Sequence, residues 1–518
     1  MKLGSRASEQ TFSLADHAGL FRRDAATAER SVAAATPSKA DEVSYLNGLN
    51  PDGTITSDSY WGDNGEVAFK YGPSTVGAGA TITYYFDPAS NFTAQEKATY
   101  LRAFATWSSV ADITFEAGGR LSADVRLVRG SDGGAYTSSF SLPGPSGLGV
   151  PLVQAMISID TSVDGFDLSG SLDTFGGYGF STVVHEIGHL IGLGHGGNYN
   201  GNVDPATQQY SAFDDRMYTI MSYIFWGAED ARYLAENPYQ GTNWGITDDG
   251  IRRQAPHSLM QLDILAIQQL YGVAKATPFD GGEVYGFNTN IEGPLAALFD
   301  FSKNTDPVVT LYNQGTGNTL DLTGYRMDQR VDLTPGAFSD IGGHVNNVAI
   351  AGGTVIETVL LGRGNDVVQT SDVASMVRGG RGNDTITGGR GGDALFGDVG
   401  DDSLTGMRGR DTLTGGIGAD LFVFETAKDS GSGRKQADVL ADFDHAEGDR
   451  IDLSGIGRAD ADFAFIGRKA FSGTAGEVRF GVPGDDALVQ LDLNGDGKAD
   501  FMLRIEDVTA LTAADFIL

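Results

Sequence analysis

Residues 185–195, HEIGHLIGLGH, place three histidines at a spacing that suits a metal ion. On a helix that advances about 100° per residue, His185 and His189 lie about 40° apart on one face. Gly192 lets the chain leave the helix, so that His195 can approach the same point from the following loop. Three neutral imidazoles leave the fourth position of a tetrahedral zinc ion open, as in catalytic sites. The spacing therefore predicts one catalytic zinc ion held by these three histidines.

Glu186 lies next to the first histidine and is the natural general base. Zinc in such a site lowers the pKa of water towards about 7, and a neighbouring carboxylate can then accept the proton. Attack of that water on a peptide carbonyl would make the chain a zinc endopeptidase. The remaining histidines have no partner at a ligand spacing, and we interpret them as ordinary structural residues. They are His17, His257, His344 and His445.

The helix that carries this motif must be held by a hydrophobic body. Val183, Ile187, Leu190 and Ile191 fall on the side away from the histidines, so we expect that side to be buried.

The segments before the motif have the mixed helix and strand patterns of an α/β domain. Residues 81–86, TITYYF, predict a strand. Thr93 with Glu96 three residues later is a capping box that opens a helix. The side chains expected to be buried on that helix are Leu101, Phe104 and Trp107.

The chain is long enough for more than one domain. Residues 1–45 show no sustained periodicity, which predicts a leader. The first domain is expected over 46–272, with Ser258 capping a closing helix that ends before Gly272. The second is expected over 273–518, where short β-like segments alternate with Gly, Asp and Asn turns.

A nine-residue repeat runs through residues 361–423 of the second domain. Its aspartates are Asp384, Asp393, Asp402, Asp411 and Asp420, with Asp366 two periods upstream and Ser375 at the position between. An apolar residue follows each repeated aspartate two places later, and these residues are Ile386, Leu395, Leu404, Leu413 and Phe422. A flexible linker would not hold an apolar residue in phase over so many periods, so we predict stacked coils with a buried core.

The same repeat has the chemistry of calcium binding. Glycines allow tight turns that point carbonyl groups inward, and one aspartate per turn adds a hard anionic oxygen. We therefore predict structural calcium ions at Asp366, Asp384, Asp393, Asp402, Asp411 and Asp420. Asp398 and Met407 replace the second glycine of their units, and we expect weaker half-sites there.

Residues 492–500 begin like an EF-hand loop, but Leu503 stands where the bidentate glutamate should be. A bound calcium ion and a plain acidic turn both remain open for this segment.

Composition excludes several functions. The chain has 36 Lys+Arg against 68 Asp+Glu, a net charge of −32, which argues against binding to a nucleic-acid backbone. It has no cysteine, so disulfides, thiolate zinc sites and cysteine nucleophiles are excluded. No apolar run approaches membrane-spanning length, and the N-terminus lacks the apolar core of a signal peptide. We expect a soluble protein with no membrane span and no cleaved N-terminal signal.

The elongated histidine motif resembles that of the metzincin proteases. Residues 219–223, TIMSY, look like the Met-turn of those enzymes, with Met221 as the apolar floor beneath the metal. A tyrosine two residues after that methionine resembles the astacin and serralysin subgroups. That resemblance implies that Tyr223 reaches the metal and stabilises the oxyanion of the tetrahedral intermediate.

The nine-residue repeat resembles the RTX parallel β-roll. A metzincin domain followed by an RTX roll is the serralysin arrangement, and the likeness extends over nearly the whole chain. It implies an α+β metzincin catalytic domain followed by an all-β parallel β-roll. Segment 263–272 and the final residues, 515–518, also look like serralysin sequence. One departure is Gly196, which follows the third histidine where serralysins usually have proline.

Serralysins leave the cell through a type I exporter that reads an uncleaved C-terminal signal, an acidic residue followed by three apolar ones. The resemblance thus implies a secreted, extracellular zinc endopeptidase that acts on proteins or peptides, with residues 1–45 as the propeptide of a zymogen. We also expect a monomer, with a proteinaceous inhibitor as a further partner. The substrate should lie extended along an edge strand above the zinc helix, and 135–142 is the stretch we favour.

Two alternatives remain. A non-enzymatic, calcium-assembled surface or adhesion protein could carry a relic zinc site, although such a relic has no reason to keep Glu186 and Tyr223. The substrate could also be one specific partner, such as a surface-layer protein.

The acidic second domain suggests a link between calcium and export. In a low-calcium cytosol the roll should stay unfolded through self-repulsion and pass through an exporter. Calcium outside the cell would then neutralise it and drive its folding.

Overall fold

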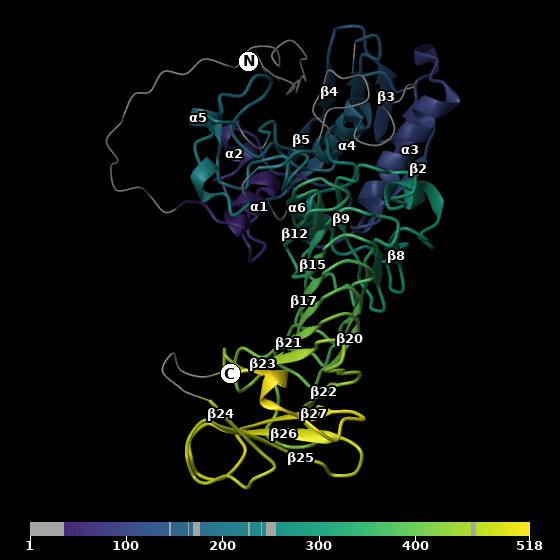
Figure 1. Cartoon of the computed structure of the whole chain (residues 1–518). Coiled ribbons are helices and arrows are strands. Elements are labelled where there is room, and N and C mark those ends of the chain that lie inside the picture. The colour runs from purple at the N-terminus through teal and green to yellow at the C-terminus, as the bar shows by residue number, and fades with distance from the viewer. Residues whose placement is uncertain are drawn as a thin grey trace.

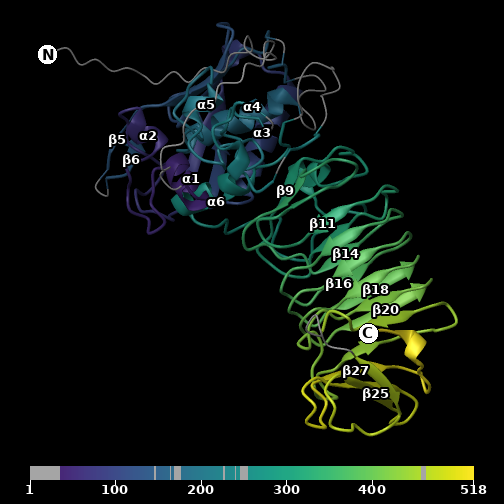
Figure 2. The ribbon, with the colours of Figure 1, turned by 60° about the vertical axis from the view of Figure 1, so that its left-hand side comes forward.

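The computed structural model describes residues 36–144, 147–163, 165–168, 177–225, 228–239, 241–244, 255–456 and 463–518. The described residues form two parts (Figures 1 and 2). A part with both helices and strands comes first, and an elongated stack of short strands extends from it, with the C-terminal strands at the far end. The fold is therefore an α+β domain followed by an all-β roll with parallel coils, as the sequence predicts. The strands between residues 477 and 505, at the far end of the roll, pair antiparallel.

The first domain is built on a five-stranded sheet in the order β2-β1-β3-β7-β4. The strands are β1 (Ala80–Phe86), β2 (Ile113–Ala117), β3 (Val125–Arg129), β4 (Ala135–Ser138) and β7 (Ala155–Ile159). Neighbouring strands are parallel except at one edge, where β4 runs antiparallel to β7. A short hairpin of β5 (Ser141–Pro143) and β6 (Gly149–Pro151) follows β4. The expected strand at 81–86 is confirmed as β1.

The described α-helices are α1 (Lys39–Asn47), α2 (Tyr60–Asp63), α3 (Ala94–Ser108), α4 (Tyr178–Leu190), α5 (Pro205–Gln208) and α6 (Gln261–Tyr271). Short 3-10 helices are η1 (Pro88–Ser90), η3 (Leu234–Glu236), η4 (Gly293–Leu298) and η5 (Ala513–Asp515). Helix α3 packs against α4, where the Trp107 indole donates a 3.0 Å hydrogen bond to the Val184 carbonyl oxygen. No helix within the described ranges has the length and apolarity needed to cross a membrane.

Helix α3 starts with the predicted capping box, since the Glu96 amide bonds the Thr93 hydroxyl and the Thr93 amide bonds the Glu96 carboxylate. Phe104 and Trp107 are buried as expected, but the prediction for Leu101 is wrong, because its side chain is 45% exposed. Leu101, Phe104 and Trp107 are three residues apart, and three residues turn a helix by about 300°, which is less than a full turn. Leu101 therefore lies off the buried face. Tyr100 takes the inward position and is fully buried.

Helix α1 lies across the boundary expected at residue 45. Ser38 and Asp41 form a capping box that starts the helix. Tyr45 and Leu46 are buried, and the Asn47 amide donates a 3.1 Å hydrogen bond to the Ala266 carbonyl oxygen on α6. The end of the expected leader therefore packs as part of the first domain, whereas residues 1–35 lie outside the described residues.

Helix α6 ends at Tyr271, just before Gly272, as predicted. The expected cap is wrong, because the helix begins after Met260, whose amide donates a 2.8 Å hydrogen bond to the Asp263 carboxylate. Ser258 lies further upstream, and its hydroxyl accepts a hydrogen bond from the Thr310 amide.

Two long sheets form the roll. The 11-stranded sheet has the order β24-β25-β26-β27-β22-β20-β18-β16-β14-β10-β8, and the 7-stranded sheet has the order β11-β15-β17-β19-β21-β23-β28. The first consists of β8 (Val284–Gly286), β10 (Thr319–Asp321), β14 (Thr358–Leu360), β16 (Met376–Arg378), β18 (Ala394–Val399), β20 (Thr412–Ile417), β22 (Asp438–Leu440), β24 (Ala464–Gly467), β25 (Glu477–Gly481), β26 (Ala487–Asp492) and β27 (Phe501–Ile505). The second consists of β11 (Arg330–Asp332), β15 (Val367–Gln369), β17 (Thr385–Thr387), β19 (Ser403–Thr405), β21 (Leu421–Val423), β23 (Arg450–Asp452) and β28 (Phe516–Ile517).

Consecutive nonapeptides alternate between these two sheets, so two repeats make one coil. In one sheet Ile386 pairs with Leu404, and in the other Leu395 pairs with Leu413. Each coil of the roll therefore contains 18 residues, which are two nine-residue repeats. The predicted inward side chains, Ile386, Leu395, Leu404, Leu413 and Phe422, are all fully buried.

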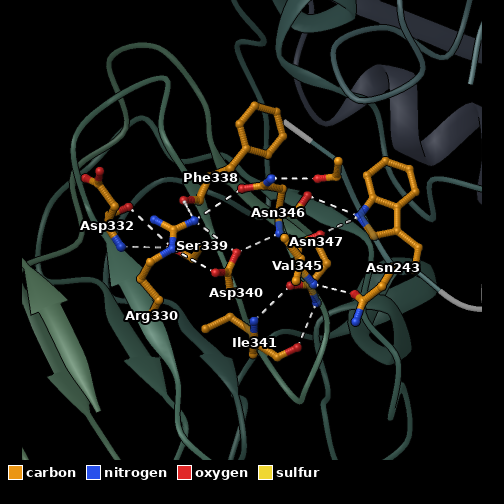
Figure 3. A network of polar contacts seen from close by, with 12 residues as sticks. Asn243, Arg330, Asp332, Phe338, Ser339, Asp340, Ile341, Val345, Asn346 and Asn347 are labelled. Atoms are coloured by element: carbon orange, nitrogen blue, oxygen red, sulfur yellow. Dashed lines mark hydrogen bonds and ion pairs between the residues drawn. The ribbon is translucent and has the colours of Figure 1, made fainter. Parts of the chain in front are cut away.

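The junction of the two domains is a polar network (Figure 3). A third small sheet of the roll, with β9 (Val309–Leu311), β12 (Phe338–Ser339) and β13 (Val348–Ile350), lies here. The Trp244 indole donates to the Val345 and Asn346 carbonyl oxygens at 3.1 and 3.2 Å. Asn346 is held in turn by Arg330, whose guanidinium also bonds Asp340 (Figure 3). The first domain therefore contacts the roll through specific hydrogen bonds.

Candidate zinc site and calcium-binding coils

Helix α4 carries the first part of the histidine motif at the centre of the first domain. All its residues from Tyr178 to Leu190 are buried. The chain leaves the helix at Gly192, whose φ is +105° and whose missing side chain makes room for the Phe69 carbonyl oxygen. A side chain at this position would overlap that oxygen. The chain therefore leaves the helix at Gly192, as predicted. His195 then joins His185 and His189.

The structure brings the three predicted ligands together. One ligand nitrogen of each lies within 4.8 Å of those of the other two, and the Nε2 atoms of His189 and His195 are 3.0 Å apart. Each Nδ1 atom is hydrogen-bonded to a backbone carbonyl oxygen. The pairs are His185 with Ile220 (2.9 Å), His189 with Leu193 (2.8 Å) and His195 with Tyr199 (2.7 Å). An Nδ1–H that donates to a carbonyl leaves the Nε2 lone pair for a metal.

Burial also suits these rings to a metal. It lowers the pKa of all three histidines, that of His189 to about 4, so the imidazoles are neutral near pH 7. A histidine must be neutral to bind a metal ion. The donor set, its convergence and its protonation therefore fit zinc with a fourth position open.

Glu186 is 1% exposed and lies beside this cluster. Burial raises the pKa of its carboxyl to about 8, and hydrogen bonds from Thr137 oppose that shift. The Thr137 hydroxyl is 2.9 Å from Glu186 Oε2 and 2.7 Å from the Glu186 carbonyl oxygen.

Tyr223 lies against the histidines. Its ring centroid is 4.5 Å from that of His195 and 5.6 Å from that of His185. Burial and the charge of Glu186 raise the pKa of the Tyr223 phenol well above its ordinary value, so the hydroxyl keeps its proton. A protonated phenol at this place can donate a hydrogen bond to a group bound at the metal.

Met221 is fully buried, as is expected of the methionine of a Met-turn. A side chain at Gly188 would meet the Met221 sulfur, so helix and turn are in close contact. Asp263 anchors the turn by accepting hydrogen bonds from the Thr219 hydroxyl and the Ile220 amide. This residue was missed at the sequence level, although an acidic residue in the first turn of a helix is a recognisable capping signal.

Gly196, the departure from the serralysin pattern, has a structural explanation. A side chain at this position would overlap the Asp214 carboxylate and crowd that of Glu42. Asp214 and Glu42 are both fully buried, and burial raises the pKa of both, that of Asp214 to about 6. Glycine thus makes room for two carboxyl groups that come from α1 and from the loop before the Met-turn.

The other histidines lie away from the cluster. His257 is buried, His344 pairs with Asp306 and His445 with Asp515, whereas His17 is outside the described residues.

The predicted calcium aspartates form two ladders along the roll. In each ladder, Oδ1 of one aspartate accepts the backbone N–H of the residue one coil before, at 2.6–2.8 Å. The first ladder contains Asp366, Asp384, Asp402 and Asp420, and the second contains Asp393 and Asp411.

The second oxygen of most of these carboxylates has no hydrogen-bond partner. Buried Oδ2 atoms of this kind belong to Asp366, Asp384, Asp402, Asp411 and Asp420, and also to Asp438, which lies beyond the repeat. Burial raises the pKa of all of them, to between about 6 for Asp366 and about 9 for Asp438. Buried anionic oxygens without partners are costly unless a cation binds them, so the donor set fits calcium. Asp393 differs, because its Oδ2 accepts the Gly389 amide.

Two aspartates outside the exact repeat continue the ladders. Asp438 accepts the amide of Asp411, and Asp449 accepts the amide of Asp420. Their spacings are 27 and 29 residues rather than 18, so a search at the nine-residue period misses them. The segment Asp449-Arg450-Ile451 keeps the aspartate and the apolar residue of the repeat pattern and could have revealed one of them.

Asp398 and Met407, which replace glycines, adopt φ values of +73° and +63°. This region disfavours both side chains, and the weaker half-sites expected there stay a prediction.

The EF-hand-like segment is the turn between β26 and β27. Both Asp492 oxygens accept backbone N–H groups, from Gly495 and Gly497, and Asp500 accepts that of Leu493. These hydrogen bonds between protein groups close the turn.

Comparison with known proteins agrees with the site. Residues 274–518 match the family described as Peptidase M10 serralysin C terminal. The metallopeptidase AprA of Pseudomonas marginalis is 34% identical over 457 residues, which cover 85% of this chain and 84% of that protein. The chain belongs to the serralysin family of metalloproteases. A serralysin of Photorhabdus luminescens is 31% identical over 304 residues, 57% of each chain.

As a member of this family, the chain is a zinc metalloendopeptidase with a metzincin catalytic domain and a β-roll. A hatching-enzyme zinc protease from Oryzias latipes covers 40% of this serralysin and 94% of its own length at 15% identity. The TM-score of this match is 0.22.

Proposed function

We propose that this serralysin is a secreted endopeptidase in which Glu186 is the general base and Tyr223 donates to the oxyanion. The convergence of three buried, neutral histidines beside a buried carboxyl group carries this proposal. A zinc ion held by His185, His189 and His195 would act as a Lewis acid that polarises the scissile carbonyl and acidifies water.

Glu186 accepts a proton from the attacking water as the water oxygen forms a bond to the carbonyl carbon. It then gives the proton to the amide nitrogen, and the C–N bond breaks to leave a carboxylate and an amine. A carboxyl group with a pKa near neutrality suits both transfers. Burial raises the Glu186 pKa to about 8 in the zinc-free chain, and the charge of a bound zinc ion would lower it from there.

Tyr223 keeps its proton and can donate it in a hydrogen bond to the oxygen that becomes negative in the tetrahedral intermediate. Such donors contribute when they are aimed at the charge that develops in the transition state. The phenol ring packs on the His195 ring, which fixes its approach.

The substrate binds along β4, the antiparallel edge strand of the five-stranded sheet. One side of this strand pairs with β7, and the other side has no strand beside it in the described sheet. An extended peptide would add to that edge through backbone hydrogen bonds. Residues 135–142, favoured from the sequence, contain this strand.

Calcium binds the aspartate ladders of the roll and folds it outside the cell. The buried Oδ2 atoms support this, because calcium would supply the cation that they lack. The same argument extends the set of calcium aspartates to Asp438. Asp449 continues the ladder through Oδ1, but its Oδ2 already accepts the Asp444 amide.

The domain limits and the route of export are part of the proposal. The catalytic domain would begin near Ser38 and end at Gly272, with the propeptide upstream and the roll over 273–518. A type I exporter would read the C-terminal signal, which in the folded chain forms β28 and pairs with β23. We propose a monomer that can be blocked by a proteinaceous inhibitor.

Mass spectrometry of peptides cut from a protein mixture tests the proposal. The wild-type chain should release many peptides, and Glu186→Gln should release none above background although it retains zinc. Full cleavage by the glutamine variant would overturn the role of Glu186, and cleavage of one protein alone would point to a single specific substrate.

A further inference from the structure

Thr137 lies within the edge strand β4 and faces the zinc helix. Ala135 and Thr137 are buried, whereas Tyr136 and Ser138 between and after them are partly exposed. This alternation is that of a strand with one covered face. Thr137 is 4% exposed and pairs with Ile157 of β7.

The Thr137 hydroxyl connects this strand to Glu186. It lies 2.9 Å from Oε2 of the carboxylate and 2.7 Å from the Glu186 carbonyl oxygen. A threonine hydroxyl has one proton and can also accept a hydrogen bond. It can therefore remain bonded to Glu186 by donating to the carboxylate, or by accepting from the carboxyl while it donates to the carbonyl.

The contact restrains the Glu186 carboxyl group. The Thr137 hydroxyl makes an observed side-chain hydrogen bond to that carboxyl group. This bond holds Oε2, and the Thr137 backbone also hydrogen-bonds the carboxyl group. A buried glutamate with free side-chain torsions would otherwise have several rotamers to choose from.

We propose that Thr137 is a positioning residue for Glu186, which couples the orientation of the general base to the strand along which the substrate binds. The inference rests on the proposed role of Glu186. Because Thr137 belongs to β4, a peptide that adds to this edge would order the strand and the carboxylate together.

Threonine suits this role better than its close relatives. Its β-branched side chain has few χ1 rotamers, so the hydroxyl direction is well defined. Valine has nearly the same shape without the hydroxyl, and serine keeps the hydroxyl with less restriction. The three residues therefore separate hydrogen bonding from packing.

The test compares Thr137→Val, Thr137→Ser, Glu186→Gln and a control, Thr106→Val, in the full zinc- and calcium-loaded chain. Thr106 is also 4% exposed, and its hydroxyl bonds a carbonyl oxygen of its own helix, α3. We expect Thr137→Val to lower kcat about tenfold with KM within about twofold of wild type, since misplaced catalytic groups mainly slow the chemical step. Thr137→Ser should restore most of kcat, and Thr106→Val should leave it unchanged.

A second readout does not depend on turnover. Zinc affinity, from competition with a chromophoric chelator, should stay within about twofold for the Thr137 variants, since Thr137 bonds no histidine in the described structure. Crystal structures of the zinc-free proteins should show one Glu186 rotamer in the wild type and several in Thr137→Val. If the valine variant does not fold, Thr137→Ala against Thr137→Ser gives the same comparison.

A wild-type kcat in Thr137→Val would overturn the inference, and so would a kcat in Thr137→Ser as low as that in Thr137→Val. If Glu186→Gln were inactive in the same experiment, the proposed function would still stand. Full activity of Glu186→Gln would overturn the proposed function itself.

Discussion

The Asp263 carboxylate accepts a 2.6 Å hydrogen bond from the Thr219 hydroxyl, which ties the closing helix α6 to the Met-turn. The same carboxylate accepts the Ile220 amide at 2.9 Å. The Ile220 carbonyl oxygen in turn bonds Nδ1 of His185 at 2.9 Å. A chain of hydrogen bonds therefore runs from α6 to the first zinc ligand.

Replacing Asp263 by alanine should loosen this chain. It leaves buried donors on Thr219, Ile220 and Met260 without an acceptor, and each such donor costs about 1–3 kcal/mol. We expect the midpoint of thermal unfolding of the catalytic domain to fall by at least about 6 °C. Zinc affinity should fall about tenfold, as when residues behind a ligand are lost.

Differential scanning calorimetry and zinc competition check this prediction, with Glu116→Ala on the exposed part of β2 as the control. An unchanged midpoint and zinc affinity in Asp263→Ala would contradict it.

Trp244→Phe should weaken the junction between the domains. The variant keeps an aromatic ring but loses the N–H that bonds the Val345 and Asn346 carbonyl oxygens. Lost hydrogen bonds of this kind cost about 1–3 kcal/mol when they leave buried acceptors. Calorimetry in calcium should show the catalytic and roll transitions moving apart, whereas a superimposable trace would mean that the contact does not couple the domains.

The roll and the zinc motif could be predicted from the sequence because their patterns are local. A helix at 100° per residue fixes where His185 and His189 point, and a nine-residue period fixes which aspartates share a ladder. Gly192 could also be predicted, since it must have a positive φ where the chain turns.

Contacts between distant segments could not be predicted in this way. Thr137 and Glu186 are 49 residues apart, and Asp263 and Thr219 are 44 apart, with no periodicity to relate them. Asp438 and Asp449 were not predicted, because extra residues between the coils break the nine-residue period. The prediction for Leu101 was wrong because residues three apart on a helix do not lie on the same line along it. The packing of the helix decides which of them is buried.

Gly418→Ala should disrupt the roll. Gly418 has a φ of +144°, and an added Cβ would overlap the Gly400 carbonyl oxygen in the coil before. We expect a higher calcium concentration for half-maximal folding, by about tenfold or more, since the strain opposes stacking. Gly481→Ala is the matched control, because an added Cβ there meets no atom within 4 Å. Equal calcium midpoints in both variants, measured by circular dichroism, would refute this account of the coil.

Protons should stabilise the calcium-free roll. Burial raises the pKa of Asp384 to about 8 and that of Asp438 to about 9, whereas an unfolded aspartate has a pKa of about 3.9. Between these values the folded roll binds more protons than the unfolded chain, so its free energy of unfolding falls as the pH rises. The stability is fully present below about pH 4 and is lost as the pH passes through about 8.

Circular dichroism of the Glu186→Gln chain in chelator checks this, because the inactive variant avoids self-digestion. The roll should be more folded at pH 5 than at pH 8, and calcium should restore it at pH 8. A chelated roll that is better folded at pH 8 would contradict the prediction.

Zinc removal and return test the central claim most directly. With calcium held in the millimolar range, a zinc chelator should abolish peptide hydrolysis by the purified chain, and about one equivalent of zinc should restore it. Glu186→Gln should take up the same zinc without regaining activity. Full hydrolysis by zinc-free protein, or by Glu186→Gln, would contradict a zinc endopeptidase built on His185, His189, His195 and Glu186.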